Sequence, residues 1–520
     1  MAKSKDKQQF YRDPVHLAEG LLSSEFFYMP PGDSEAVRKG AANTLAFWRG
    51  DFYHWQKGVY RLISESDIRC EVVKHMRKLK EQAQNDDEDV RITTGTVNNL
   101  LLCLKELVHL PADRSLNSWP YDMHGIGIYS VAVENGIMLF YPYKLDPKPA
   151  LKSHSPHFFN VAKLACRYDS KAECPMWEAF LEQVMCGDAE FIELLQQWTG
   201  YLLLPDMRHH KFLLNAGEGG NGKSVFVEVL QGLLGVENCS TVPLARFGNP
   251  FALYGTYGKL LNATDETTHI VEEEAEATMK RFVTGQTITF ERKFRDSFEG
   301  KPTAKLMINT NALPRFNDKT SGTWRRLLLV PWEYTVPEDL QIKDFAGEIC
   351  KKELPGILNW ALAGLASLNS HNGFVKPSRT EELIAEYRRD SDPTRTFLED
   401  HFAFAPNAIG ILCQSIYDEY REWCGAKGYR PVNNANFGQQ VRRIFPSVKR
   451  VRPGSGATRP WRYDYLTQIT SQTSFNLWVH WYPPSVMQPR YFAWFASVQL
   501  WSFLYARMLR AFYMHSFDVK

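Results

Sequence analysis

The chain has 520 residues, of which 44% are hydrophobic and 23% are charged, and its net charge is +2 at pH 7. This length and composition predict a globular protein with two to four folding units. A net charge so close to zero excludes nucleic-acid binding through an overall basic composition, so any nucleic-acid surface must be local.

The nine cysteines are scattered singly, without a C-x-x-C pair, and no secretory signal precedes them. We therefore expect a reduced, cytoplasmic protein without structural zinc.

Residues 1–150 are expected to form an N-terminal α+β domain. The segment from Leu45 to Ile63 alternates aromatic and polar residues around turns at Gly50-Asp51 and Lys57-Gly58, which predicts a small meander. The acidic run from Asp86 to Asp89 is interpreted as a solvated loop rather than a metal site. Two helices and a strand with a turn are predicted in residues 68–84, 98–110 and 135–145.

A second domain is predicted over residues 155–375, beginning with two helices in residues 168–204. Trp177, Phe180, Leu181 and Val184 follow helical spacing, so they are expected to face a core. Strand and helix signals then alternate from residue 211 to 332, which predicts a mainly parallel sheet with helices on both faces.

A glycine-rich loop between a strand-like and a helix-like segment reads GEGGNGKS. It matches G-x-x-x-x-G-K-[ST], whose backbone N–H groups point at phosphate oxygens while the next helix adds its positive end. Lys223 is expected to reach the outer phosphates of ATP, and Ser224 to hold Mg²⁺. The predicted nucleotide-binding residues are Gly217, Glu218, Gly219, Gly220, Asn221, Gly222, Lys223 and Ser224.

An apolar run after the loop, KLLNATDE, ends in Asp265 and Glu266. A carboxylate at the end of a buried strand beside the phosphate loop can orient magnesium, and a second can polarise the attacking water. Asp265 is assigned the first role and Glu266 the second, although the two roles could be exchanged. Alternatively, these carboxylates cap the next helix.

The segment 285–305 carries five Lys or Arg and three Phe between two strand-like ends. It predicts a β-hairpin that grips single-stranded DNA through phosphates and bases without recognising sequence. The alternative is an exposed hairpin whose charges only aid solubility. The predicted nucleic-acid residues here are Arg292, Lys293, Arg295 and Lys301.

Two further motifs follow the hairpin. The apolar run AKLMINT ends before Asn311, which is expected to sense the γ-phosphate or position the water, or else to form a turn before Pro314. Arg325 and Arg326 precede the apolar strand LLLVPW. One of them is expected to stabilise transition-state charge in a neighbouring subunit, unless both form ordinary surface ion pairs.

Residues 376–468 predict three helices and a short hairpin. Between Arg430 and Asp464 there are eight Lys or Arg against one acidic residue, so a DNA-facing wing is expected. The predicted contacts are Arg442, Arg443, Lys449 and Arg450.

Residues 469–520 form an aromatic-rich tail of unknown role. The stretch from Tyr491 to Tyr505 carries no charge but is short for a membrane span. A packing or partner helix is an alternative. We favour a non-homologous extension, including one translated from a shifted frame.

Taken together, five motifs between residues 217 and 332 resemble those of a superfamily 3 helicase: the phosphate loop, KLLNATDE, ERKF, KLMINTNALP and GTWRRLLLVPW. YDSKAECP, GYLL and NGKS resemble, more narrowly, the phage/plasmid and poxvirus-type primase-helicases. The resemblance covers roughly residues 45–465. It implies an AAA+-related P-loop ATPase, a C-terminal winged helix and a hexameric ring around DNA. In this family Lys293 corresponds to the B′ lysine, Asn311 to the sensor, and Arg325 or Arg326 to the arginine finger.

These features predict an ATP-dependent DNA helicase that moves along single-stranded DNA at the replication fork of a phage, plasmid or integrated element. Residues 1–150 contain no metal-binding D-x-D with an attendant His, so primer synthesis is assigned to a separate primase. A membrane partner is not expected. Two alternatives remain: an ATPase of the same fold that remodels or loads a protein, and a degenerate remnant that only binds DNA.

Overall fold

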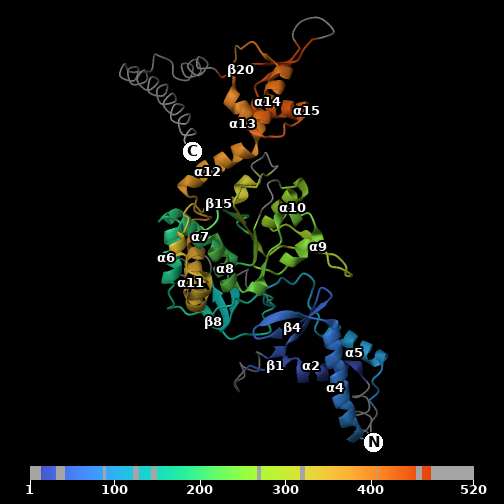
Figure 1. Ribbon diagram of the computed structural model, residues 1–520. Coiled ribbons are helices and arrows are strands. Elements are labelled where there is room, and N and C mark those ends of the chain that lie inside the picture. The colour runs from blue at the N-terminus through green and yellow to red at the C-terminus, as the bar shows by residue number, and fades with distance from the viewer. Residues whose placement is uncertain are drawn as a thin grey trace. The chain divides into compact units, whose positions relative to one another are not determined.

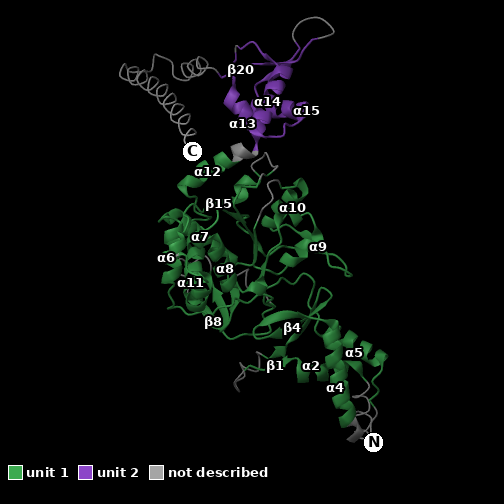
Figure 2. Cartoon of the chain, in the orientation of Figure 1, with its two compact units in different colours: residues 1–387 green, residues 388–520 purple. Residues whose placement is uncertain are grey.

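The computed structural model describes residues 13–30, 41–85, 90–120, 128–141, 149–265, 271–314, 316, 322–406, 408–452 and 459–469 (Figure 1). The chain divides into two compact units, residues 1–387 and residues 388–520 (Figure 2). Glu266, the acidic run 86–89 and the tail 471–520 lie outside the described residues, so the predictions for them stay predictions.

A five-stranded parallel sheet forms the centre of the first unit. Its strands stand in the order β10-β11-β14-β9-β15, and every neighbouring pair is parallel. The predicted parallel sheet is therefore confirmed. The strands are β9 (Phe212–Ala216), β10 (Cys239–Ser240), β11 (Leu261–Asp265), β14 (Lys305–Thr310) and β15 (Leu327–Pro331).

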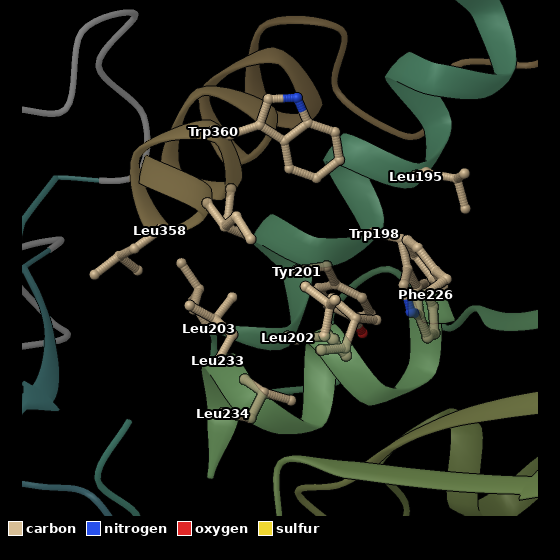
Figure 3. Close-up of a cluster of buried hydrophobic side chains, with 14 of the residues drawn as sticks. Leu195, Trp198, Tyr201, Leu202, Leu203, Phe226, Leu233, Leu234, Leu358 and Trp360 are labelled. Atoms are coloured by element: carbon tan, nitrogen blue, oxygen red, sulfur yellow. The ribbon is translucent and has the colours of Figure 1, made fainter. Parts of the chain in front are cut away.

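The two faces of this sheet pack against different helices. Leu213 of β9 belongs to one hydrophobic cluster, whereas its neighbours Phe212 and Leu214 belong to another, as the alternation of a strand requires. The first cluster includes residues of α6 (Pro175–Val184), α7 (Ala189–Leu202), α8 (Lys223–Leu234) and α11 (Phe345–Ser370). Figure 3 shows members of this cluster from α7, α8 and α11. The second includes residues of α10 (Glu273–Val283), α9 (Pro250–Leu253) and η3 (Leu244–Arg246).

Helix α6 shows the predicted apolar face, because Trp177, Phe180, Leu181 and Val184 are all buried. Short turns of 3-10 helix connect the main elements of this region: η2 (Val236–Asn238), η4 (Tyr254–Thr256), η5 (Trp324–Arg326) and η6 (Glu338–Leu340).

The N-terminal part is an α+β arrangement with its own core. The predicted meander is confirmed as the antiparallel strands β3 (Leu45–Trp48), β4 (Asp51–Gln56) and β5 (Val59–Ile63). The predicted helices are α4 (Glu65–Asn85) and α5 (Thr94–Leu107). The part also contains α2 (Pro14–Glu25), β1 (Phe27–Tyr28) and β2 (Ala42–Asn43).

A second antiparallel sheet joins this part to the centre of the unit. It consists of β6 (Tyr129–Val133), β7 (Gly136–Phe140) and β8 (Ala150–Lys152). Tyr129, Val133, Met138 and Phe140 belong to the same cluster as helices α6, α7, α8 and α11. This sheet is therefore part of the central core, although it precedes the sequence boundary expected near residue 150.

Helix α12 (Ser378–Ser391) spans the sequence boundary between the units. The second unit contains the three predicted helices and the hairpin β18–β19, around a core that includes Phe397, Tyr420, Phe437 and Tyr463. Its elements are α13 (Pro393–His401), β16 (Phe402–Phe404), β17 (Ile411–Leu412), α14 (Cys413–Lys427), α15 (Asn434–Ile444), β18 (Lys449–Val451), β19 (Arg462–Asp464) and β20 (Leu466–Gln468).

Candidate nucleotide site and nucleic-acid interface

The glycine-rich loop connects β9 to α8, as the sequence predicts. Gly220 and Gly222 have φ of +75° and +89°, in the left-handed region that favours glycine. A Cβ on Gly217 would lie 2.2 Å from the carbonyl oxygen of Trp332. The loop therefore needs glycine at these positions to keep its backbone open toward the end of the sheet.

Lys223 is held inside the loop. Its Nζ donates to the carbonyl oxygens of Gly217 and Glu218 at 2.5 and 2.8 Å, and to Oδ1 of Asn221 at 2.9 Å. Burial lowers the pKa of Lys223, and the negative charge of Asp265 opposes that shift. The lysine thus presents its ammonium group at the loop, where phosphate oxygens are expected.

A chain of side-chain hydrogen bonds beside the loop links residues on β9, β14 and β11 with Trp332, which follows β15. Trp332 Nε1 donates to Asn215 Oδ1 at 3.1 Å, and Asn215 Nδ2 donates to Asn309 Oδ1 at 2.9 Å. Asn309 Nδ2 then donates to Asp265 Oδ1 at 3.1 Å. These bonds orient the Asp265 carboxylate. The sequence analysis did not identify Asn215 and Asn309. The signal that could have indicated them is a polar residue inside each of two apolar strands.

A cavity of about 590 Å³ lies at this edge of the sheet. Lys223, Ser224, Asp265 and Asn311 all line it, so the structure brings together four residues that were predicted from three separate motifs. The Ser224 hydroxyl and the Asp265 carboxylate are oxygen ligands of the kind magnesium prefers, so the residues present fit that ion. Apolar residues complete the lining, and sequence reasoning assigned them no site role: Phe180, Val184, Val336, Ile342 and Phe345.

Arg325 and Arg326 lie at the opposite edge of the sheet. Leu327, which follows them, pairs with Phe212 at the beginning of β9, whereas the loop follows the end of β9. A strand of five residues separates the two edges by roughly 16 Å. Arg325 is exposed, and its carbonyl oxygen accepts from Lys211 Nζ at 2.6 Å. Arg326 is partly buried, and its Nη1 donates to the carbonyl oxygen of Gly322.

The predicted hairpin is confirmed as β12 (Ile288–Phe290) paired antiparallel with β13 (Phe298–Gly300). Lys293, Phe294 and Arg295 at its tip are exposed, and Phe294 is fully exposed to solvent. Phe251 of α9, also exposed, lines a surface hollow of about 620 Å³ together with residues 292–296. Sequence reasoning missed Phe251, because its distance along the chain from the hairpin gives no sign of their proximity.

Arg292 lies at the base of the hairpin loop, shortly after the end of β12, and differs from the three residues of the tip. Its side chain is 15% exposed and forms an ion pair with Asp51. Its guanidinium carbon also lies 5.3 Å from the ring centre of Tyr254. The predicted DNA contact of Arg292 stays a prediction, but in this structure the side chain is committed to protein partners. Lys301, beyond the hairpin, is exposed.

The second unit exposes all four of its predicted basic residues, Arg442 and Arg443 on α15 and Lys449 and Arg450 on β18. Trp461 adds an aromatic surface among them. The guanidinium carbons of Arg450 and Arg452 each lie 4.5 Å from its ring centre.

Within the described ranges, no group of three or more His, Cys, Asp or Glu side chains is placed to hold a metal ion. The nine cysteines are free. Among the helices of those same ranges, none combines the length and apolar composition needed to cross a membrane.

Two family profiles match parts of the chain. A family of unknown function (DUF5906) matches residues 215–326, which include the phosphate loop, the hairpin and both candidate finger arginines. The RFX DNA-binding domain matches residues 392–469, which make up most of the described part of the second unit.

The chain is similar to two viral proteins named putative helicases. It is 28% identical over 254 residues to Putative helicase 022R of Frog virus 3 (isolate Goorha), covering 44% of this chain and 25% of that protein. It is 25% identical over 164 residues to Putative helicase L207/L206 of Acanthamoeba polyphaga mimivirus, covering 28% and 17% respectively. The chain thus spans a quarter or less of the length of these relatives, and their names do not distinguish superfamily 3 from other helicases.

DNA-binding protein RFX7 of Xenopus laevis is 36% identical over 72 residues, covering 14% of this chain and 5% of that protein. Among solved structures, the apo structure of the NrS-1 C-terminal region has a TM-score of 0.48 at 14% identity, covering 88% of this chain and 100% of that chain.

Proposed function

We propose that this chain is an ATP-dependent DNA helicase of superfamily 3 that moves along single-stranded DNA during replication of a phage, plasmid or integrated element. The observation that carries the proposal is the convergence of Lys223, Ser224, Asp265 and Asn311 on one cavity. The similarity to two putative helicases supports it. The strand order, with β9 between β14 and β15, is compatible with the AAA+-related fold that the motifs imply.

The nucleotide chemistry assigns a role to each of the polar residues that the motifs predicted. Lys223 meets the outer phosphates of ATP, and Asn311 senses the γ-phosphate or positions the water. Ser224 and Asp265 would hold magnesium, which would supply positive charge to neutralise the phosphates. Glu266, which follows Asp265 in the sequence, polarises the attacking water.

In the proposed ring, Arg325 serves a neighbouring subunit. Both arginines lie at the edge opposite their own phosphate loop, and the exposure of Arg325 favours it over the partly buried Arg326 as the arginine finger. The guanidinium would then stabilise charge that develops during hydrolysis in the adjacent subunit. The proposed assembly is a homohexamer, and priming is left to a separate primase.

The proposed DNA contacts combine charge with stacking. Lys293 and Arg295 would bind backbone phosphates, while the exposed rings of Phe251 and Phe294 would stack on bases without recognising their sequence. The second unit is proposed to be a winged-helix domain that binds duplex DNA through α15 and the β18–β19 hairpin. The RFX DNA-binding profile over residues 392–469 supports that part of the proposal.

The decisive experiment measures ATP hydrolysis with and without single-stranded DNA, together with the mass of the protein in solution. A ring whose turnover rises with DNA supports the helicase. Turnover that rises only with a protein partner would support the remodelling ATPase instead, and a chain that binds DNA without hydrolysing ATP would be the degenerate remnant.

A matched DNA-binding test uses Lys293→Ala. Loss of one phosphate contact should weaken binding to a single-stranded oligothymidine and lower the slope of log affinity against log salt by roughly 0.7. A parent-like slope would mean that the hairpin charge only aids solubility.

A further inference from the structure

The turn between β3 and β4 in the N-terminal meander touches the base of the basic hairpin. Asp51 Oδ2 accepts a hydrogen bond from Arg292 Nη1, and Asp51 Oδ1 lies 3.6 Å from Arg295 Nη1. Arg295 Nη1 also donates to the carbonyl oxygen of Gly50 at 3.3 Å. One short turn therefore engages two of the arginines that sequence reasoning assigned to nucleic acid.

The ion pair is shielded from water. The side chains of Asp51 and Arg292 are 9% and 15% exposed, unlike a surface pair, which water and salt would weaken. Burial by itself lowers the pKa of Arg292, but the hydrogen bond and charge of Asp51 outweigh it and raise that pKa. Breaking such a pair leaves a charge without its partner, which is costly in a shielded site.

Arg49 makes a second attachment on the same turn. Its Nη1 donates to the carbonyl oxygen of Glu299 at 2.9 Å and to the Tyr257 hydroxyl at 3.2 Å. Its Nε donates to the carbonyl oxygen of Ala112 at 3.0 Å. Arg49 has φ of +48°, and Gly50 has φ of +84°, as in hairpin turns that prefer Asn and Gly. The strained backbone at Arg49 is held in place by these three bonds.

Aromatic side chains pack between Arg49 and Arg292. Phe298 of β13 has the guanidinium carbon of Arg49 at 5.4 Å from its ring centre and that of Arg292 at 5.7 Å. Trp48 stacks on Tyr257, with ring centres 6.4 Å apart and planes 12° apart. Tyr257 in turn contacts Phe298 at 4.9 Å. The turn and the hairpin base therefore pack as one cluster.

From these contacts we propose that Asp51 is a positioning residue for the hairpin: through Arg292 it fixes the base of the hairpin loop, so that Lys293 and Phe294 stand at the tip ready for single-stranded DNA. Because Arg292 is paired with Asp51, it does not grip phosphate itself. This inference rests on the proposed function, since it takes the tip to be the DNA contact. It gives the N-terminal part a role in DNA binding that its own sequence does not suggest.

The test compares full-length Asp51→Asn with the parent. Losing the carboxylate lets the hairpin base move, so affinity for a single-stranded oligothymidine should fall by about 5- to 150-fold, the usual range of coupling between sites. The DNA concentration that gives half-maximal stimulation of ATP hydrolysis should rise by the same factor, while turnover at saturating DNA stays near that of the parent. The salt slope should not change, because no phosphate contact is lost.

Three further variants make the result specific. Asp113→Asn removes an exposed carboxylate from the same part of the chain, so it should bind like the parent and exclude a general charge effect. Asp51→Glu keeps the charge and should recover most of the affinity. In an Arg292→Met background, Asp51→Asn should weaken binding no further, because the pair is already broken.

Two outcomes would overturn the inference while leaving the proposed function intact. Asp51→Asn could bind DNA as well as the parent. Alternatively, it could bind more tightly with a steeper salt slope, which would make Asp51 a competitor of phosphate for Arg292. Asp51→Asn could also fail to fold, which loss of DNA-independent hydrolysis would reveal. In that case Asp51→Glu and Arg292→Met are compared instead, and the inference fails if Asp51→Glu binds DNA as weakly as Arg292→Met. If the parent itself binds no single-stranded DNA, the proposed function fails instead.

Discussion

The two edges of the central sheet use lysine in opposite ways. At the carboxyl edge, Lys223 borders a cavity that Asp265 also lines. At the amino edge, Lys305 is fully buried, with its Nζ bonded to the carbonyl oxygen of Leu204 and 4.9 Å from the ring centre of Tyr201. Burial lowers the pKa of Lys305 to about 7.

This contrast separates a cation that lines a cavity from one that the fold has enclosed completely. The amino edge nevertheless carries an exposed cation, Arg325, beyond its enclosed lysine. Under the proposed function, the carboxyl edge would bind nucleotide, Lys305 would be structural, and Arg325 would contact another subunit. Each assignment predicts a different response to substitution.

The largest effect is expected from Lys223→Ala at the carboxyl edge. The substitution removes the charge that meets the outer phosphates, so ATP hydrolysis should fall to background while the fold survives. Steady-state hydrolysis and circular dichroism check both parts. Parent-like turnover would mean that the phosphate loop has been assigned wrongly.

Arg325→Ala should bind nucleotide and lose about 10³- to 10⁵-fold in turnover, because a finger acts on transition-state charge. Mixing it with Lys223→Ala should restore part of the activity, since some sites then combine an intact finger with an intact phosphate loop. Recovery with Arg326→Ala but not with Arg325→Ala would transfer the role to Arg326. No recovery with either variant, in verified mixed rings, would remove the main support for a finger acting between subunits.

Asn309→Ala tests the hydrogen-bond chain that orients Asp265. It leaves the buried Asn215 amide without its partner, so the free energy of unfolding should fall by roughly 1–3 kcal/mol. Turnover should fall while ATP affinity changes less, because Lys223 and the loop are intact. Thermal denaturation and kinetics measure the two effects. Loss of stability with unchanged turnover would restrict Asn309 to a structural role.

The smallest effect on turnover is expected from Lys305→Met at the amino edge, where the change appears in the pH dependence of stability. The folded pKa near 7 lies below the unfolded value near 10.5, so the unfolded parent binds more protons between these pH values. Parent stability should therefore rise with pH across this window, by at most roughly 1.4 kcal/mol per pH unit relative to Lys305→Met. Denaturant unfolding at several pH values measures the difference, and parallel curves would show that Lys305 stays charged when folded.

The hairpin shows where sequence reasoning reached its limit. Its basic and aromatic composition predicted an exposed, DNA-facing element, and Lys293, Phe294 and Arg295 are indeed exposed. Composition could not separate Arg292 from them, because its partner Asp51 lies 241 residues earlier in the chain. Phe251 was missed for the same reason, since only the folded chain brings α9 beside the hairpin.

The sequence by itself determined the phosphate loop, the parallel α/β sheet and the ends of β11 and β14, because glycine conformations and strand periodicity are set within a few neighbouring residues. Tertiary structure decided which polar residues meet across strands. It also decided that Arg325 is exposed and that Arg292 is paired with Asp51. The hydrogen bonds from Asn215 to Asn309 and from Asn309 to Asp265 depend on strand register. The ion pair of Asp51 with Arg292 depends on the packing of distant segments. Local residue patterns do not encode such contacts, because each contact joins segments that are far apart in the sequence and meet only in the folded chain.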